Sequence, residues 1–268
     1  MRVSINEKSF YVKENSSIFD IKNRFKKDAD VVILNGFPIE KDEVLKENDK
    51  VVLIKKGEIP SKEELEHLLV SRHTPKVYDK LKKEAVGIAG LGGLGSNVAV
   101  SLSRIGIGKL VLVDFDVVEP SNLNRQQYLI KHLGMKKTEA MKEMISEINP
   151  FVKVEIKDKY ITEDNVLDIF KNVDIIVEAF DSPKCKASLV SEILTKTKDK
   201  VIVAASGMAG YFSSNTIKTK KINDRFYLIG DEVNEAKEGS GLMAPRVSIT
   251  ANHQANMVLR LIMGQKET

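Results

Sequence analysis

The chain has 268 residues, 42% of them hydrophobic and 30% charged, so it can bury a substantial core in one large domain or in a large domain with a small partner. The net charge is only +4, from 42 basic and 38 acidic residues mixed along the chain, and this balance argues against nucleic acid as a partner. A single cysteine, Cys185, excludes an internal disulfide and a cysteine-cluster zinc site, so no zinc is expected.

The sequence is expected to contain no targeting or membrane segment. Residues 1–8 carry charge where a signal peptide would need an apolar core. No later run reaches the uncharged length of a membrane span. We therefore expect a cytoplasmic protein that does not contact a membrane.

Residues 1–57 predict a small domain with the element order ββαββ. The expected strands lie at 2–6, 9–13, 31–34 and 50–55. Asn6-Glu7 suits a hairpin turn between the first two strands, and Ser16-Ser17 indicates the start of the helix.

This pattern resembles the ubiquitin-like sulfur carriers of the ThiS type over nearly the whole segment, and the resemblance implies a β-grasp fold. Such carriers end in a free Gly-Gly whose terminal carboxylate is activated. Here the segment has one glycine, Gly57, at its end, and the chain continues. We therefore expect that this segment is not the activated partner. It could block the site, mimic the carrier or be a decayed carrier.

Residues 58–84 predict a helical linker. The segment is charged, and Pro60-Ser61 gives a helix start ahead of Leu65. Pro75 precedes a second short helical stretch, which leads into the next strand.

Residues 85–96 indicate a strand, a tight turn and the start of a helix. Gly90, Gly92 and Gly95 stand at the G-x-G-x-x-G spacing, where a turn, a close approach to phosphate and a close helix contact each need a residue without a Cβ. A second buried strand ends in Asp114, about twenty residues further on, where nucleotide-binding folds place an acid on the ribose. The order of these features predicts a nucleotide site.

The stretch 115–127, which contains S-N-L-N-R-Q, is the most specific in the chain, and a G-x-x-K motif ending at Lys137 follows it. Together with the glycine loop and the V-D-x-D of Asp114, these motifs resemble the ThiF/MoeB branch of the ubiquitin-activating-type (E1-like) adenylyltransferases over about 85–215. With a ThiS-like segment ahead of it, the chain is most similar to ThiF-type sulfur carrier adenylyltransferases of thiamine biosynthesis.

The rest of the chain alternates between strands and helices. The expected elements are a helix at 137–148, a strand at 152–156, a helix capped by Thr162, a strand at 173–179, a helix from Lys184, a strand at 201–205, antiparallel strands within 211–233 and a helix from Pro245. This alternation predicts an α/β fold for 85–268, a Rossmann-like, mostly parallel sheet with crossover helices.

The resemblance implies a site for ATP and Mg²⁺. The nucleotide-binding residues that it implies are Gly90, Gly92, Gly93, Asp114, Asp116, Ser121, Asn122, Asn124, Arg125, Lys137, Asp181 and Ser182. Arg125 and Lys137 would stabilise charge on the α-phosphate. Asp181 would hold Mg²⁺, which prefers hard oxygen ligands. These three residues are the expected catalytic residues.

Most of these residues also have a plainer interpretation. Asp116 and Glu119 could be simple loop acids, and Asp181 could cap a helix. Arg125 and Lys137, taken without their motif, could be surface cations. Only the joint spacing of these residues favours a site.

Two residues outside the motifs are also candidates. Arg72 precedes the glycine loop, where related enzymes supply an arginine, but its favoured interpretation is an exposed linker residue. Cys185 is interpreted as a buried small residue, with a low-pKa thiol at a helix start as the second interpretation. Some ThiF-type enzymes carry a reacting cysteine beyond the sheet, and the corresponding stretch 230–244 has none.

The resemblance implies ATP-dependent adenylation of the C-terminal Gly-Gly carboxylate of a separate ThiS-type carrier, with release of pyrophosphate, by a homodimer. Three other functions stay open. The first is a nucleotide-linked oxidoreductase, which the S-N-L-N-R-Q stretch argues against. The second is an ATP-binding regulatory module in which the fused domain occupies the docking surface of the carrier. The third is an adenylyltransferase for a molybdopterin-type carrier or a tRNA base, and the near-neutral charge disfavours tRNA.

Overall fold

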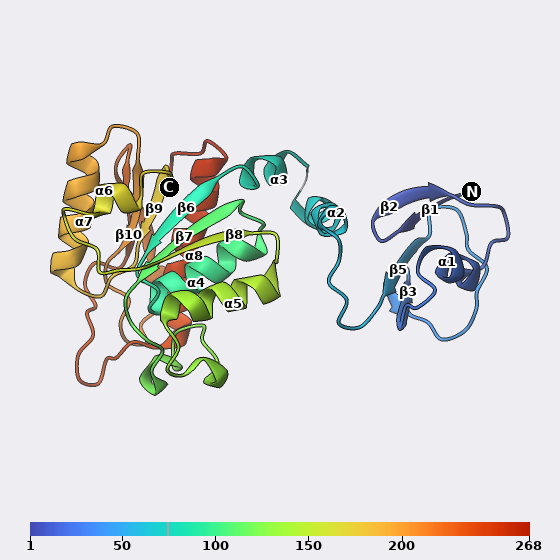
Figure 1. The fold of residues 1–268 in the computed structure, drawn as a ribbon, viewed down its shortest axis with the longest axis horizontal. Coiled ribbons are helices and arrows are strands. Elements are labelled where there is room, and N and C mark those ends of the chain that lie inside the picture. The colour runs from blue at the N-terminus through green and yellow to red at the C-terminus, as the bar shows by residue number, and fades with distance from the viewer. Residues whose placement is uncertain (74) are drawn as a thin grey trace. The chain divides into compact units, whose positions relative to one another are not determined.

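The computed structural model describes residues 1–73 and 75–268, without the side chains of residues 71–75 (Figure 1). The side chain of Arg72 therefore lies outside the described residues. The chain divides into two compact units, Met1–Tyr78 and Asp79–Thr268. Two helices, α2 (Lys62–His73) and α3 (Pro75–Leu81), occupy the expected linker.

The first unit contains a five-stranded sheet and helix α1 (Ile18–Phe25). Its strands are β1 (Arg2–Ile5), β2 (Lys8–Tyr11), β3 (Val31–Leu34), β4 (Phe37–Pro38) and β5 (Lys50–Ile54), in the order β2-β1-β5-β3-β4. Ser17 caps α1 through a reciprocal pair of hydrogen bonds with Asp20. The expected ββαββ order is confirmed, with the short β4 added after the tight turn at Asn35-Gly36, where both residues have positive φ.

The second unit is built on a seven-stranded sheet. The strands are β6 (Ala85–Ala89), β7 (Lys109–Asp114), β8 (Lys153–Asp158), β9 (Ile175–Glu178), β10 (Val201–Ala205), β11 (Lys218–Asn223) and β12 (Phe226–Gly230), in the order β11-β12-β10-β9-β6-β7-β8. Every neighbouring pair is parallel except β11 with β12. The predicted Rossmann-like, mostly parallel sheet is therefore confirmed.

Helices cover both faces of this sheet (Figure 1). They are α4 (Gly93–Arg104), α5 (Lys137–Ile148), α6 (Val166–Ile169), α7 (Pro183–Lys196) and α8 (Ala244–Ile262). Val111 and Val113 of β7 share a buried cluster with residues of α6 and α7. Their neighbours Leu110 and Leu112 are also buried and point to the opposite face, because side chains alternate along a strand. A strand buried on both faces explains the continuous apolar run that ends at Asp114.

The structure corrects one helix boundary. The sequence predicts a helix capped by Thr162, but α6 begins only at Val166. The Asn165 side chain accepts a hydrogen bond from the Thr162 backbone at 2.9 Å and donates one to the Tyr160 carbonyl. These local bonds hold 162–165 in a turn and delay the helix.

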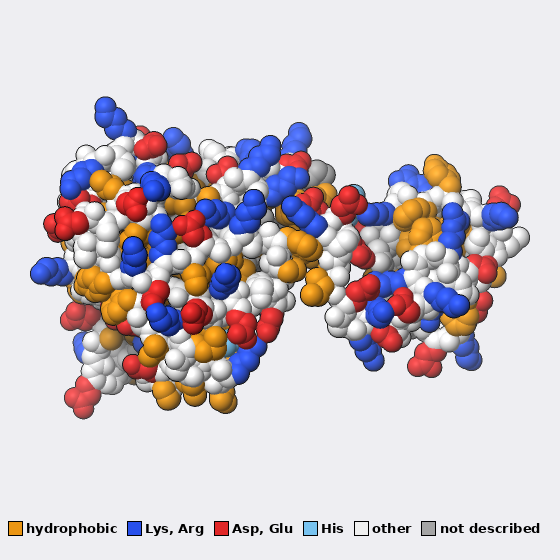
Figure 2. All heavy atoms as spheres, in the orientation of Figure 1, with side chains coloured by type: hydrophobic (Ala, Val, Ile, Leu, Met, Phe, Trp, Pro, Cys, Tyr) orange, Lys and Arg blue, Asp and Glu red, His pale blue; other side chains and the backbone are white. Residues whose placement is uncertain are grey.

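The surface carries charges of both signs. Figure 2 shows basic and acidic side chains interspersed over the visible face of each unit. Among the described residues, no helix has the length and apolar character needed to cross a bilayer.

Candidate nucleotide-binding site

The residues predicted for the nucleotide meet at the carboxyl ends of the parallel strands. A cavity of about 850 Å³ lies there, which is within the usual range for ligand pockets, about 300–1,000 Å³. In the sheet, β7 and β8 lie on one side of β6, and β9 and β10 lie on the other. The strand order therefore reverses at β6, and ligands bind in the crevice that opens at such a reversal. Of the predicted residues, the cavity is lined by Gly90, Gly92, Gly93, Asp114, Asp116, Asn122, Arg125, Lys137, Asp181 and Ser182.

The glycine loop has no room for side chains at its tightest points. Gly90 has a φ of +91°, which favours glycine. A Cβ at Gly95 would lie 1.8 Å from the Gly90 carbonyl oxygen, and one at Gly93 would lie 3.0 Å from the Val247 side chain. Helix α4 begins at Gly93, which lines the cavity. The free N–H groups of its first turn are therefore available to an anion.

Asp114 joins the end of β7 to the glycine loop. Its Oδ2 accepts a hydrogen bond from the Leu91 backbone at 2.6 Å, and its Oδ1 accepts one from the Asp116 backbone at 2.8 Å. Burial raises the pKa of the Asp114 carboxyl above its usual value, although the two N–H donors act in the opposite direction. Each carboxylate oxygen can accept a second bond, so Asp114 can also receive ribose hydroxyls.

Lys137 is a buried cation, so its plainer interpretation as a surface residue is wrong. Its Nζ lies 2.8 Å from Oδ2 of Asp116, and its backbone donates to the Asp116 carbonyl at 3.0 Å. Only 8% of its side chain is exposed. Asp116 therefore holds the ammonium group at the cavity and is more than a simple loop acid. The neighbouring Lys136 instead forms an exposed pair with Asp158.

Arg125 is held by two residues that were themselves predicted to bind the nucleotide. Its Nη1 donates to the Ser121 carbonyl at 3.1 Å and to Oδ1 of Asn124 at 2.8 Å. Neither Ser121 nor Asn124 is among the residues that line the cavity, so the structure does not place these two predicted residues at the cavity wall. Asn122 does line it, and accepts a hydrogen bond from the Glu119 backbone at 3.1 Å that closes a short 3₁₀ turn, Pro120–Asn122.

Asp181 stands on the turn between β9 and α7. Its side chain is exposed and lines the cavity. The cap of α7 is Ser182, which accepts a hydrogen bond from the Cys185 backbone at 3.4 Å, so the interpretation of Asp181 as the helix cap is wrong.

The chemistry of this site fits a magnesium ion that is held partly by a phosphate ligand. In the described part of the chain, no group of three acidic, histidine or cysteine side chains could hold a metal alone. Magnesium in phosphate-transfer sites usually takes one or two carboxylates, with the remaining ligands from substrate phosphates and water. The exposed carboxylate of Asp181, which lines the same cavity as the glycine loop, fits that need.

A buried ion pair that the motifs did not reveal supports the Asp181 turn. Glu178, the last residue of β9, is fully buried; it accepts a hydrogen bond from the Phe180 backbone at 2.7 Å and one from Nζ of Lys186 at 2.6 Å. Burial raises the pKa of Glu178, and the charge of Lys186 opposes this shift. An acid at the end of the apolar run 173–179 was the sequence signal for this pair.

A hydrogen-bond network centred on Asn97 ties the glycine loop to Arg125. The side chain of Asn97 donates to the Gly93 carbonyl at 2.7 Å and to the Arg125 carbonyl at 3.2 Å. Gln127 and Ser248 donate to its Oδ1 at 2.6 and 3.0 Å. Hydrogen bonds thus connect the first turn of α4, the S-N-L-N-R-Q stretch and α8.

Two loops close the cavity beyond β10 and β12. They include Gly207, Met208, Glu232 and Asn234, which line it. Buried Arg246 of α8 pairs with Asp231 and also donates to the carbonyls of Phe212 and Ser213, at 2.9 and 2.7 Å. Although burial opposes the shift, hydrogen bonds from Asn234, Val233 and Arg246 lower the pKa of Asp231 to about 2.

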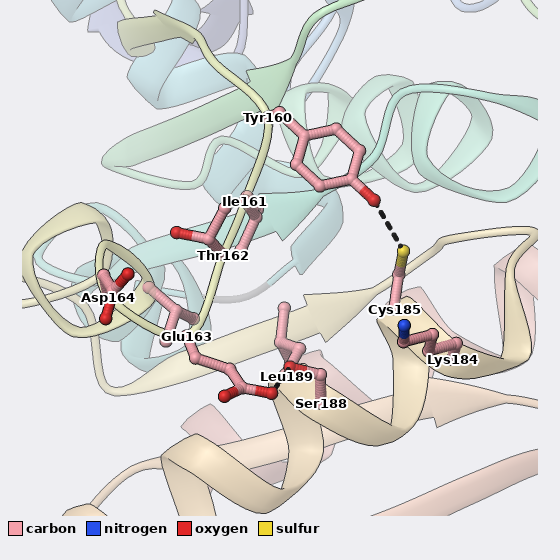
Figure 3. Close-up of a pocket in the computed structure, with 10 residues that line it drawn as sticks. Tyr160, Ile161, Thr162, Glu163, Asp164, Lys184, Cys185, Ser188 and Leu189 are labelled. Atoms are coloured by element: carbon pink, nitrogen blue, oxygen red, sulfur yellow. Dashed lines mark hydrogen bonds between the residues drawn. The ribbon is translucent and has the colours of Figure 1, made fainter.

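Cys185 is not the buried small residue that the sequence suggested. It is half-buried on the first turn of α7 and lines the cavity. Its Sγ lies 3.0 Å from the hydroxyl of Tyr160, as Figure 3 shows. The hydrogen bonds with Tyr160 and Ser182 lower the pKa of the thiol. The thiol therefore faces the segment that follows β8 and not the core.

Comparison with known proteins is consistent with this site. Residues 65–268 match the ThiF family, and residues 1–57 match the ThiS-like ubiquitin family. The tRNA threonylcarbamoyladenosine dehydratase of Haemophilus influenzae is 36% identical over 140 residues, which are 52% of each chain. The adenylyltransferase and sulfurtransferase UBA4 of Candida glabrata is 30% identical over 192 residues, 69% of this chain and 44% of that one. The chain spans about half the length of these relatives.

A solved structure has the same fold. The E. coli tRNA N6-threonylcarbamoyladenosine dehydratase TcdA in complex with ATP has a TM-score of 0.68 and 23% identity, and the match covers 78% of this chain and 98% of that one. The family match covers well over half of the sequence and includes the whole seven-stranded unit. The chain therefore belongs to the ThiF family and carries a ThiS-like ubiquitin domain ahead of it.

Proposed function

We propose that this protein uses ATP and Mg²⁺ to adenylate the C-terminal Gly-Gly carboxylate of a separate ThiS-type sulfur carrier, in the thiazole branch of thiamine biosynthesis. One observation carries the proposal. A single cavity contains the glycine loop, Asp114 at the end of β7, two cations and Asp181 after β9. Adenylation needs this set, because it requires a bound nucleotide, stabilisation of charge on the α-phosphate and a site for magnesium.

The reaction joins a carboxylate oxygen of the carrier to the α-phosphorus of ATP and breaks the bond to the β-phosphate, which leaves as pyrophosphate. N–H groups at the start of α4 bind the phosphates, and Asp114 receives the ribose hydroxyls. Lys137 and Arg125 stabilise the negative charge that gathers on the transferring group. Asp181 would hold Mg²⁺, which would supply positive charge to offset that of the leaving pyrophosphate.

The ion pair of Lys137 with Asp116 gives the buried ammonium group a counter-charge in the absence of ATP. Asp116 compensates the charge of Lys137 at 2.8 Å and is itself about half exposed. When a phosphate enters, it can share the ammonium group with Asp116. Arg125, fixed by Ser121 and Asn124, offers its remaining guanidinium N–H groups to the same phosphate.

The wider arrangement follows from the same proposal. Residues 1–57 form the ThiS-like domain, 58–84 the linker and 85–268 the adenylyltransferase domain. The protein acts in the cytoplasm as a homodimer, and its partner is a separate carrier with a free Gly-Gly end. The adenylyltransferase name of the UBA4 relative supports carboxylate activation, and the ATP complex of TcdA supports the nucleotide.

A second candidate keeps the adenylation chemistry but changes the acceptor. The 36% identity to a tRNA threonylcarbamoyladenosine dehydratase favours a carboxylate on a modified tRNA base. The mixed surface charge weakens this candidate, because tRNA binding draws on clustered Lys and Arg. Adenylation of a molybdopterin-type carrier and regulation through ATP binding alone are two further candidate functions.

The test is ATP–pyrophosphate exchange with Mg²⁺, measured with no acceptor, with a ThiS-type protein ending in Gly-Gly and with tRNA. We expect exchange that requires the carrier and is lost in Asp181→Ala. Asp168→Ala is the matched control and should keep wild-type exchange. It removes an exposed acid of α6 that pairs with Lys171. Exchange driven by tRNA alone would favour the second candidate. ATP binding without exchange for any acceptor would favour the regulatory module.

A further inference from the structure

One buried amide joins three segments of the chain around the phosphate end of the cavity. Asn97, on the second turn of α4, is 4% exposed and is not among the residues that line the cavity. Its Nδ2 donates to the carbonyls of Gly93 and Arg125. Its Oδ1 accepts from Gln127 and Ser248. An amide has two donor hydrogens and two acceptor lone pairs, so this side chain is fully bonded. Asn97 can therefore influence the reaction only through the segments that it joins.

The position of Arg125 depends on this amide. Ser121 and Asn124, which hold the guanidinium group, belong to the same stretch as Arg125. Their bonds fix the group relative to that stretch and not relative to the glycine loop. In the part of the chain that the structure describes, the Arg125 carbonyl accepts a hydrogen bond from Asn97 alone, at 3.2 Å. This bond joins the backbone of the stretch to α4.

The glycine loop depends less on Asn97. Gly93 is the first residue of α4. In an α-helix each carbonyl also accepts the backbone N–H four residues further on, so the Gly93 carbonyl keeps a partner when the Asn97 side chain is lost. The backbone at Arg125 loses its support at the same time. Loss of this amide should therefore displace Arg125 while the first turn of α4 still binds phosphate.

We propose that Asn97 is a positioning residue that holds Arg125 against the phosphate-binding turn of α4, an inference that rests on the proposed adenylation. A displacement of about 1 Å in a reacting geometry can lower a rate about 100-fold, even when the substituted residue is remote from the chemistry. The guanidinium group of Arg125 stabilises charge on the α-phosphate as AMP is transferred. Asn97 thus acts on the transition state through Arg125 and has little influence on the binding of ATP.

The packing of α4 on α8 provides an internal control. Ser248 of α8 donates to Asn97 at 3.0 Å. One turn further along both helices, Ser101 donates to Asn252 at 2.7 Å. Both serines are half-buried, and neither lines the cavity. Of the two bonds, the first reaches the amide that contacts Arg125. A role in helix packing would make the two bonds equivalent, whereas a role in positioning Arg125 would not.

The test is carrier-dependent ATP–pyrophosphate exchange with Mg²⁺, in which kcat and the KM for ATP are measured on the full-length protein. Asn97→Ala should lower kcat about 10- to 100-fold and change KM less than about threefold. Ser248→Ala, which removes one bond to the amide, should lower kcat about threefold, and Ser101→Ala should keep the wild-type kcat. A thermal melt shows whether each variant is folded. If Asn97→Ala does not fold, the comparison of the two serine variants decides.

A double-mutant cycle shows whether the effect passes through Arg125. If it does, adding Asn97→Ala to the Arg125→Met variant should lower kcat less than about twofold further, because the group to be positioned is already absent. If Asn97→Ala lowers kcat as strongly in that variant as in wild type, the two residues act independently and the inference is wrong.

The remaining outcomes separate this inference from the proposed function. If wild type catalyses exchange and Asn97→Ala keeps its kcat, Asn97 does not position Arg125, and the inference is wrong while adenylation stands. The same holds if Ser248→Ala and Ser101→Ala lose equal activity, or if Asn97→Ala raises KM alone. If wild type shows no exchange with any carrier, the proposed function fails and the inference fails with it.

Discussion

The two sides of the cavity are stabilised in different ways. On the side of β6 and β7, the glycine loop is held by hydrogen bonds among residues of the recognisable motifs, such as Asp114 with the Leu91 backbone. On the side of β9 to β12, two buried ion pairs, Glu178–Lys186 and Asp231–Arg246, hold the turns and loops. Motif residues thus supply part of the support on the first side, together with Asn97 and Ser248, whereas the other side depends on residues that carry no motif.

This difference bears on the proposed role of Asp181 as a metal ligand. Its own side chain is exposed, but its turn is anchored through the neighbouring Phe180 backbone and Glu178. The turn that carries the carboxylate is therefore held by contacts that a metal would not have to displace. The two sides should respond differently to substitution.

The largest effect is expected on the motif side, from Lys137→Met. The substitution keeps a similar volume but removes a buried cation that we propose contacts the α-phosphate, so carrier-dependent exchange should fall about 100- to 1,000-fold. Lys136→Met, which removes an exposed neighbouring lysine, is the matched control and should keep near-normal exchange. Equal losses in both variants would show that Lys137 has no special place at the site.

On the opposite side, Lys186→Met should mainly reduce stability. The change leaves Glu178 buried without its counter-charge, which should lower the free energy of unfolding by about 3 kcal/mol in urea denaturation. The pKa of Glu178 is already raised by burial, and loss of Lys186 should raise it further. Stability of this variant should therefore decrease as pH rises and Glu178 ionises. If the unfolding free energy of Lys186→Met equalled that of the wild-type protein at every pH, the pair would not support the fold.

Gly95→Ala tests how closely the glycine loop is packed. The new Cβ would meet the Gly90 carbonyl oxygen at 1.8 Å, so the backbone must shift, at a cost of about 1–3 kcal/mol in unfolding free energy. ATP affinity should fall as well. Gly241→Ala is the control, because a Cβ there meets nothing within 4 Å and the backbone has no positive φ. Similar melting temperatures for both variants would mean that the loop can relax without loss.

The smallest effect concerns pH and the Asp231–Arg246 pair. Because the pKa of Asp231 is lowered to about 2 in the folded state, from an ordinary value of 3.8, its carboxylate stabilises the fold above about pH 4. That contribution is lost as pH falls from about 4 towards 2. Asp231→Asn should therefore show a smaller fall in melting temperature between these pH values than wild type does. If the melting temperatures of Asp231→Asn and wild type fell equally as the pH was lowered, Asp231 would not be a source of acid sensitivity.

The sequence predicted the fold and the motif side of the cavity well. Gly90, Gly95 and Asp114 occupy positions where backbone geometry permits few residue types, so their spacing alone is informative. Asn122 and Lys137 could be placed through the resemblance to a family. Ser121 and Asn124 belong to the same motif, but in the structure they orient Arg125 and do not line the cavity.

The parts that the sequence could not predict depend on contacts that leave no mark on the hydrophobic pattern. The surroundings of Cys185 are set by Tyr160, which follows a strand three positions away in the sheet from the strand before α7. The helix expected at Thr162 begins later because the Asn165 side chain competes for the local backbone. Neither effect changes the spacing of apolar residues, so periodicity could not reveal it.

The most direct test of the proposed adenylation is transfer of AMP to a carrier. The full-length protein would be incubated with Mg²⁺, ATP labelled at the α-phosphate and a ThiS-type protein that ends in Gly-Gly, beside the same carrier without its last glycine. We predict that label appears on the intact carrier alone and that hydroxylamine, which attacks acyl adenylates, removes it. ATP binding without label on any carrier that ends in Gly-Gly would contradict the proposed adenylation.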